Sequence, residues 1–130
     1  MRFRIWVSAA LAGVILVVLS GPAQAHHSIP SFYDENKTIS ITGLVTQVKI
    51  INPHSQIFLE VTDPNGQKAT WIAITVAGTQ MIRNRWAADV FKVGSTLTLA
   101  GNPPRKQGTN GIVLHAVTTS DGKTFKLGID

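Results

Sequence analysis

The sequence predicts a mainly β protein, a small OB-type five-stranded barrel with one short helix between strands three and four. Three observations predict this fold class. Five apolar runs of strand length alternate with turns rich in Pro, Gly, Asn and Asp. One helical pattern falls between the third run and the fourth. The first run also changes its apolar face at a glycine, as a bent strand would. This order of elements fits an OB-type barrel, and an open meander sheet capped by the helix is the alternative.

The first predicted strand, residues 38–51, carries the signal for bending. Ile39 and Ile41 share one face of the alternation. The apolar residues on the other face all come after Gly43: Leu44, Val48 and Ile50. One extra residue in a strand moves the following side chains to the opposite face, so the switch predicts a β-bulge at Gly43.

The remaining elements follow in order. Turn-forming residues at 52–55 (NPHS) and 63–66 (DPNG) make the first three strands a meander. The further predicted strands are 56–62, 68–77, 91–101 with its entry turn, 112–120 and a short last one at 123–127. The helix is predicted over 79–86, with Thr79 as N-cap and Met81, Ile82 and Arg85 at helical spacing. Residues 102–111 form a polar loop with two prolines and two glycines.

Residues 1–25 read as a Sec signal peptide that is cleaved. Two arginines precede an uncharged apolar run from Ile5 to Leu19, and Ala23-Gln24-Ala25 matches a cleavage site. The run is shorter than the roughly 20 residues that a membrane span needs. An uncleaved anchor is the alternative interpretation. We therefore expect export to the periplasm or outside the cell, with no stable membrane span after cleavage.

Cleavage before His26 would leave 105 of the 130 residues, an extended arm over 26–37 and a single β-barrel domain over 38–130. The chain has no cysteine, so packing alone must stabilise it. Without Arg2 and Arg4, ten of the 12 basic residues remain against seven acidic ones, a net charge of +3. This excess and the few aromatic residues do not indicate a nucleic-acid partner.

No pattern in the chain indicates an enzyme. Its carboxylates do not form a pair at catalytic spacing, and it has no nucleophile-elbow, P-loop or dinucleotide-binding motif. The predicted mature chain holds a single methionine, Met81, which excludes a methionine-rich Cu(I) carrier.

The mature chain carries a series of short motifs: His26-His27-Ser28, Gly43-x-Val45, "NPHSQIFLEV" at 52–61, Trp71, the Arg83 to Trp86 motif and "VTTSDGK" at 117–123. Together these motifs resemble those of a bacterial family of small exported proteins of unknown function. The resemblance covers nearly all of the mature chain. It implies an exported single-domain protein, and it implies no activity.

His26 and His27 are the first candidate metal ligands. After cleavage, the α-amine and Nδ1 of His26 can form a chelate, and the amide nitrogen and imidazole of His27 can add two donors in one plane. Nitrogen donors in a tetragonal arrangement suit Cu(II). A second arrangement uses only the amine and imidazole of His26, completed by a distant histidine; it resembles the histidine brace of exported copper proteins. The alternative is an arm whose histidines bind nothing.

His54 and His115 are the other candidates. His54 lies in the first turn, where it either caps backbone groups or presents an exposed imidazole. His115 lies in the fifth strand on the face of Val113 and Val117, where it either packs or joins the site. All four histidines form one site only if arm, turn and fifth strand meet.

The sequence thus predicts a non-enzymatic exported protein that binds Cu(II), or another divalent metal, through His26 and His27. The alternative function is a metal-free periplasmic OB-type module. It would bind a protein, peptide or small ligand on the barrel face near residues 102–111.

Overall fold

A computed structural model describes residues 29–128; the predicted signal peptide, His26 and His27 lie outside this part of the chain. Its strands are β1 (Ile39–Lys49), β2 (Gln56–Thr62), β3 (Lys68–Ile74), β4 (Thr96–Asn102), β5 (Gly111–Thr119) and β6 (Thr124–Lys126). Its helices are short: α2 (Ile29–Phe32), α3 (Gly78–Arg83) and α4 (Trp86–Asp89). Within the described residues, no helix has the length and apolar character needed to cross a membrane.

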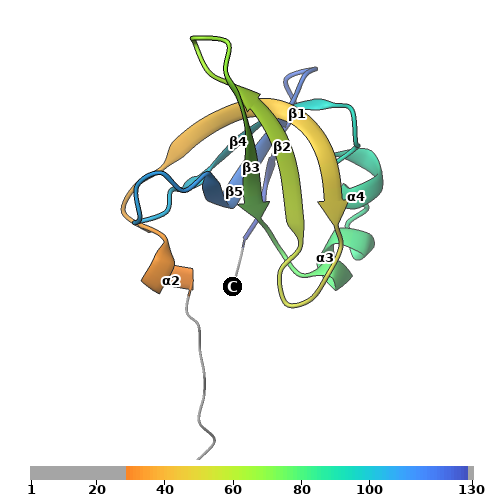
Figure 1. Cartoon of the computed structure of the whole chain (residues 1–130). Coiled ribbons are helices and arrows are strands. Elements are labelled where there is room, and N and C mark those ends of the chain that lie inside the picture. Colours follow the sequence, from red (N-terminus) through yellow and green to blue (C-terminus); the bar gives the residue numbers. More distant parts are fainter. Residues whose placement is uncertain (1–28, 129–130) are drawn as a thin grey trace, which may run out of the picture.

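The five long strands close into a barrel (Figure 1). They pair antiparallel in the order β3-β2-β1-β4-β5, and β3 then pairs in parallel with β5, from Ile72 opposite Gly111 to Ile74 opposite Val113. β6 extends the sheet beyond β5. A closed five-stranded barrel with α3 and α4 between β3 and β4 confirms the OB-type prediction and excludes the open meander.

The bulge in β1 does not lie at Gly43, so that prediction is wrong in position. β1 pairs regularly with β4 through Gly43, and the register shift falls between Val45 and Gln47, opposite β2. The core face runs without interruption up to the bulge: Ile39, Ile41, Gly43 and Val45. Leu44 is 40% exposed. The apparent change of face came from a glycine at an inward position followed by an outward leucine.

Gly43 is required for a different reason, the close approach of β2. An added Cβ would lie 2.7 Å from the Glu60 carbonyl oxygen and 3.0 Å from Cγ2 of Val61. Beyond the pair of Leu44 with Glu60, β1 leaves β2 and continues beside β4 alone. The glycine thus lets β1 bend sharply over the barrel.

We expect Gly43→Val to lower the free energy of unfolding by about 1–3 kcal/mol, because the side chain overpacks against the β2 backbone. Leu44→Val is the matched control, since it places the same side chain on the exposed face and should change stability by less than about 0.5 kcal/mol. Urea unfolding of the two variants measures both values. Equal stabilities would contradict the close approach at Gly43.

The core lies inside the barrel and under the helical segment. Its buried apolar residues are Ile41, Val45, Ile57, Leu59, Ala73, Val76, Met81, Val90, Phe91, Leu97, Leu99, Ile112, Leu114, Val117 and Leu127. Trp71 is partly buried against this cluster, and Met81 is buried in it. The core therefore accounts for the alternation of inward and outward residues along β1, β2 and β4.

The helical segment differs from the single predicted helix. α3 begins at Gly78, and Arg85, with a φ of 57°, separates it from α4. Thr79 is not the N-cap: it lies within the first turn of α3, where its N–H points at Oδ1 of Asn52 at 3.4 Å. A side chain from the β1–β2 turn thus takes the capping role, which local sequence does not reveal.

Candidate functional site

Residues 29–37 are docked on the barrel. The prediction of an arm without secondary structure is wrong for these residues, because α2 forms a helical turn closed by Tyr33 N–H donating to the Ile29 carbonyl at 3.0 Å. The arm lies against the β4–β5 loop. Asp34 N–H donates to the Pro103 carbonyl and Arg105 N–H to that of Phe32, each at 2.9 Å. The arm and the loop therefore form one structural unit (Figure 1).

Charged and aromatic side chains hold this unit together. The Asp34 carboxylate lies 3.3 Å from Nζ of Lys37 and 3.9 Å from Arg105, whose Nε donates to the Pro30 carbonyl at 3.1 Å. The Tyr33 hydroxyl lies only 3.2 Å from where a Cβ on Gly111 would stand, so the missing side chain makes room for it. Burial raises the pKa of Tyr33.

The pKa of Asp34 is lowered, first by the hydrogen bond with Lys37 and further by the Asn36 N–H and the charge of Arg105, against an opposing effect of partial desolvation. A carboxyl group whose pKa is lowered by folding stabilises the docked arm above the ordinary carboxyl range. That contribution is lost as the pH falls through the lowered pKa.

Asn102 joins the arm to His115. It is 5% exposed at the end of β4, and its Nδ2 donates to the carbonyls of Lys37 at 2.7 Å and Glu35 at 3.4 Å. The amide oxygen must therefore face His115, and Nε2 of His115 donates to it. In the neutral ring this assignment leaves the lone pair on Nδ1 of His115, the state required of a metal ligand.

A β-bulge aims His115 outward. The register of β5 against β4 passes from Ala116 opposite Ala100 directly to Leu114 opposite Gly101, so His115 is the extra residue. The predicted shared face with Val113 and Val117 is therefore wrong: both valines are buried, whereas His115 is exposed. Bulges often re-aim one side chain in this way next to functional sites.

We expect Asn102→Ala to destabilise the protein by about 1–3 kcal/mol, because it leaves a buried polar group and the arm carbonyls without partners. The arm should also become accessible, which limited proteolysis within residues 29–37 measures. The conservative control is Lys106→Ala in the same loop, an exposed change expected to leave both readouts unaltered. An arm equally protected in both variants would contradict this role of Asn102.

His54 lies in the β1–β2 turn, apart from this junction. Its ring is half-buried rather than exposed, and its Nδ1 is buried with no hydrogen-bond partner among the described residues. His54 therefore does not cap backbone groups through its Nδ1 atom, as one of the two predicted roles required. Ser55 holds the turn instead, with N–H donating to the Val76 carbonyl at 2.9 Å and Oγ donating to that of Ile51 at 3.2 Å.

The structure does not gather the predicted ligands into a complete metal site. No group of three or more His, Cys, Asp or Glu side chains within residues 29–128 could hold a metal ion. His54 and His115 are therefore single imidazoles on different elements. His26 and His27 are outside the described residues, so their part in a site stays a prediction.

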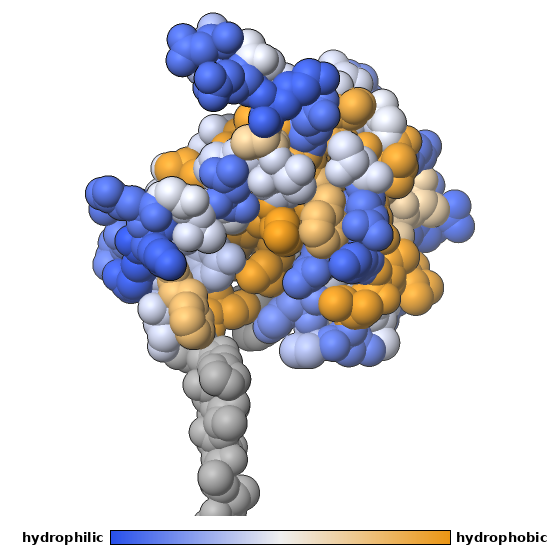
Figure 2. Space-filling model, in the orientation of Figure 1, coloured by the Kyte–Doolittle hydropathy of each residue, from blue (hydrophilic) through white to orange (hydrophobic). Residues whose placement is uncertain are grey.

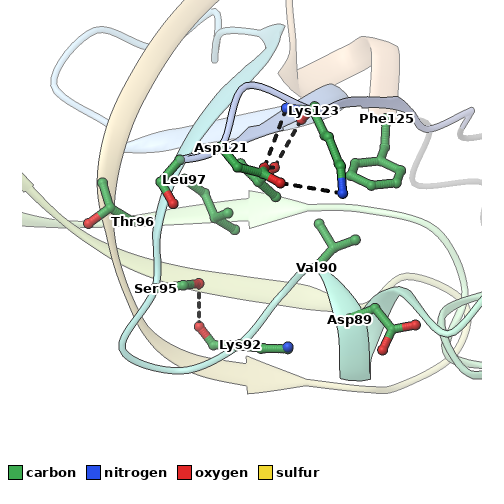
Figure 3. A pocket seen from close by; sticks show the side chains of 11 residues that line it. Asp89, Val90, Lys92, Ser95, Thr96, Leu97, Asp121, Lys123 and Phe125 are labelled. Carbon is green, nitrogen blue, oxygen red and sulfur yellow. Dashed lines mark hydrogen bonds and ion pairs between the residues drawn. The ribbon is translucent and has the colours of Figure 1, made fainter.

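Two hollows on the barrel surface were not predicted. One, of about 320 Å³, lies between α4, the start of β4 and the β5–β6 hairpin (Figure 3). Its Asp121 faces Lys123 at 3.4 Å, and bonds first from Thr119 and then from Lys123 lower the pKa of Asp121. The other, of about 460 Å³, lies between β1 and the β2–β3 hairpin beside Trp71. In the first hollow, Thr119, Asp121 and Lys123 are thus bonded to one another.

Sequence reasoning missed Asn102 and Arg105, which it placed in an ordinary polar loop. Their partners on the arm are more than 60 residues away in the sequence, so no local signal could identify them.

Comparison with known proteins identifies the family of this chain, and the function of that family is unknown. No curated protein matches the chain. A family of unknown function, DUF6152, matches residues 12–114, a segment that includes the arm and β1 to β4. The match covers well over half of the 130 residues, and the chain belongs to this family of unknown function.

Proposed function

We propose that this protein is exported, is processed to begin at His26, and binds Cu(II) through that terminus without catalysing a reaction. The donor set supports copper over other divalent metals. An α-amine, one or two imidazoles and a backbone amide are all nitrogen donors, and Cu(II) prefers such donors in a tetragonal plane. Its role would be to hold or deliver the metal in the periplasm.

The observation that carries the proposal is the docked arm. Residues 29–37 are fixed to the β4–β5 loop by the backbone N–H groups of Asp34 and Arg105 and by the side-chain amide of Asn102. Only two residues separate His26 from Ile29 in the sequence. A metal ion bound at the terminus would therefore be held close to the docked arm.

His115 is the best supported of the two distant histidines as a third ligand. His115 is exposed and lies on a bulge, and its Nε2–H donates to the side-chain Oδ1 of Asn102. Metal-bound histidines almost always donate their other ring N–H in this manner. His54 lacks such a partner at its buried Nδ1. A brace completed by His115 is thus favoured over one completed by His54.

Copper titration of the processed protein tests the proposal, with binding followed by visible absorption and electron paramagnetic resonance. His26→Ala should abolish tight binding. His115→Ala should weaken it strongly in a brace and His27→Ala only mildly, whereas the reverse order indicates the planar arrangement. Binding should also fall as the pH drops through the imidazole and amine range, because protons compete for the same lone pairs. Unchanged affinity of the His26→Ala protein would refute the proposal.

One observation favours a second function, ligand binding on the outer face of β2 and β3. Ile72 is partly exposed beside the half-buried Phe58, whose ring lies 4.8 Å from Nζ of Lys49. The 102–111 loop adjoins this face, because Ile72 N–H donates to the Asn110 carbonyl at 3.1 Å. Figure 2 shows apolar surface over these strands. OB barrels bind ligands on this side, and this function would lead if copper does not bind.

A further inference from the structure

A second apolar patch lies at the β1–β2 turn and α3, away from the arm and from both hollows. Ile50, Ile51 and Ile82 are 42%, 46% and 67% exposed. We call these three side chains the isoleucine patch. None of them lines either hollow. Figure 2 shows apolar surface at the lower right, where Figure 1 places α3 and the end of β1.

The three isoleucines are held together by the packing of the turn on α3. Gly78 N–H donates to the Ile51 carbonyl at 2.9 Å, and a Cβ on Gly78 would lie 3.1 Å from Cγ2 of Ile50. Ile82 is one turn further along the same face of α3, and helical side chains point back toward the N-terminus. Ile82 is thus directed at the turn that carries the other two.

The surroundings of the patch carry positive charge and almost no negative charge. Lys49 directly precedes Ile50, and the exposed Arg83 directly follows Ile82. The sequence contains no Asp or Glu from 36 to 59, nor from 69 to 88. The nearest acidic residue after α3 is Asp89, which is paired with Arg85 at 3.1 Å.

We propose that the isoleucine patch docks the protein on an anionic membrane surface, with Lys49 and Arg83 at the level of the lipid headgroups. Branched apolar side chains presented by a turn and a helix can enter the acyl boundary, while flanking cations pair with anionic lipids. The absence of carboxylates from both segments removes the repulsion that an anionic surface would otherwise exert. The proposal does not depend on copper.

Vesicle co-sedimentation of the processed protein, with a chelator present, tests this docking. We expect binding to phosphatidylglycerol vesicles and little to phosphatidylcholine vesicles. Ile82→Ser should weaken binding about tenfold, since it removes a largely exposed apolar side chain from the interface. Arg83→Ser should weaken it about fivefold at low salt.

Two controls match these variants. Val93→Ser alters an equally exposed apolar residue (65%) away from the patch, and Lys106→Ser removes a cation from the β4–β5 loop. Neither should change vesicle binding. Absence of binding to anionic vesicles would overturn the proposal and favour an acidic protein partner. Binding that Ile82→Ser leaves unchanged would also overturn it, because attraction by net charge alone would then suffice.

Discussion

Gly101→Ala should lower the free energy of unfolding by more than about 3 kcal/mol, the largest effect expected for any single methyl group added to this barrel. An added Cβ would lie 1.9 Å from the carbonyl oxygen of Val113 and 3.0 Å from Cγ1 of Ile112. The first of these is backbone, so it cannot yield by a rotamer change. Gly101 is also paired with Ile39 on its other side. β4 therefore has no direction in which to move.

Gly101→Ala should also disrupt the contacts among Asn102, His115 and the arm. Gly101 lies opposite the bulge that carries His115, and it directly precedes Asn102. Displacing β4 would separate Asn102 from both His115 and the arm, so protection of residues 29–37 against proteolysis should also be lost.

Gly122→Ala is the control for this prediction. Gly122 has a φ of +85° with nothing within 4 Å of its Cβ position, so its substitution costs only the strain of the left-handed conformation, about 1 kcal/mol. Urea unfolding followed by tryptophan fluorescence compares the two variants. A Gly101→Ala protein no less stable than Gly122→Ala would contradict the close packing of β4 on β5.

The strands of this barrel could be predicted from the sequence because a strand that buries one face places an apolar residue at every second position. β2, for example, is found at its predicted bounds. The bulges could not be placed. A single extra residue, Thr46 in β1 or His115 in β5, shifts the alternation, yet an inward glycine such as Gly43 imitates the same signal. Only the partner strand reveals which of them occurs.

The candidate site was predicted less completely than the fold. The residue types followed from the sequence, since histidines after a cleavage site stand out by chemistry alone. Their relative positions did not, because they depend on contacts between distant segments. The side chain of Asn102 bonds both to the arm and to His115. The side chain of Asn52, in the β1–β2 turn, accepts a hydrogen bond from the first turn of α3. Such side-chain bonds across the fold leave no periodic trace in the sequence.

Acetylation of the α-amine of His26 should weaken Cu(II) binding by orders of magnitude. The change leaves every side chain and the whole barrel in place. It turns the α-amine into an amide, so the chelate ring between the amine and Nδ1 no longer forms. The replacement donor at that position is a peptide nitrogen, which must lose a proton before it can bind the metal.

The effect should appear in both ligand arrangements, because the planar set and the brace share the amine of His26. It also separates metal binding at the terminus from weak binding to the other imidazoles. His54 and His115 keep their surroundings in the acetylated protein, so their contribution should be unchanged.

The most direct measurement is therefore the dissociation constant for Cu(II) of two proteins, one with a free α-amine at His26 and one with that amine acetylated, each determined in competition with a chelator of known affinity. We predict tight binding by the first and at least a hundredfold weaker binding by the second, about 2.7 kcal/mol. Equal dissociation constants would contradict a copper site built on the terminus of the docked arm.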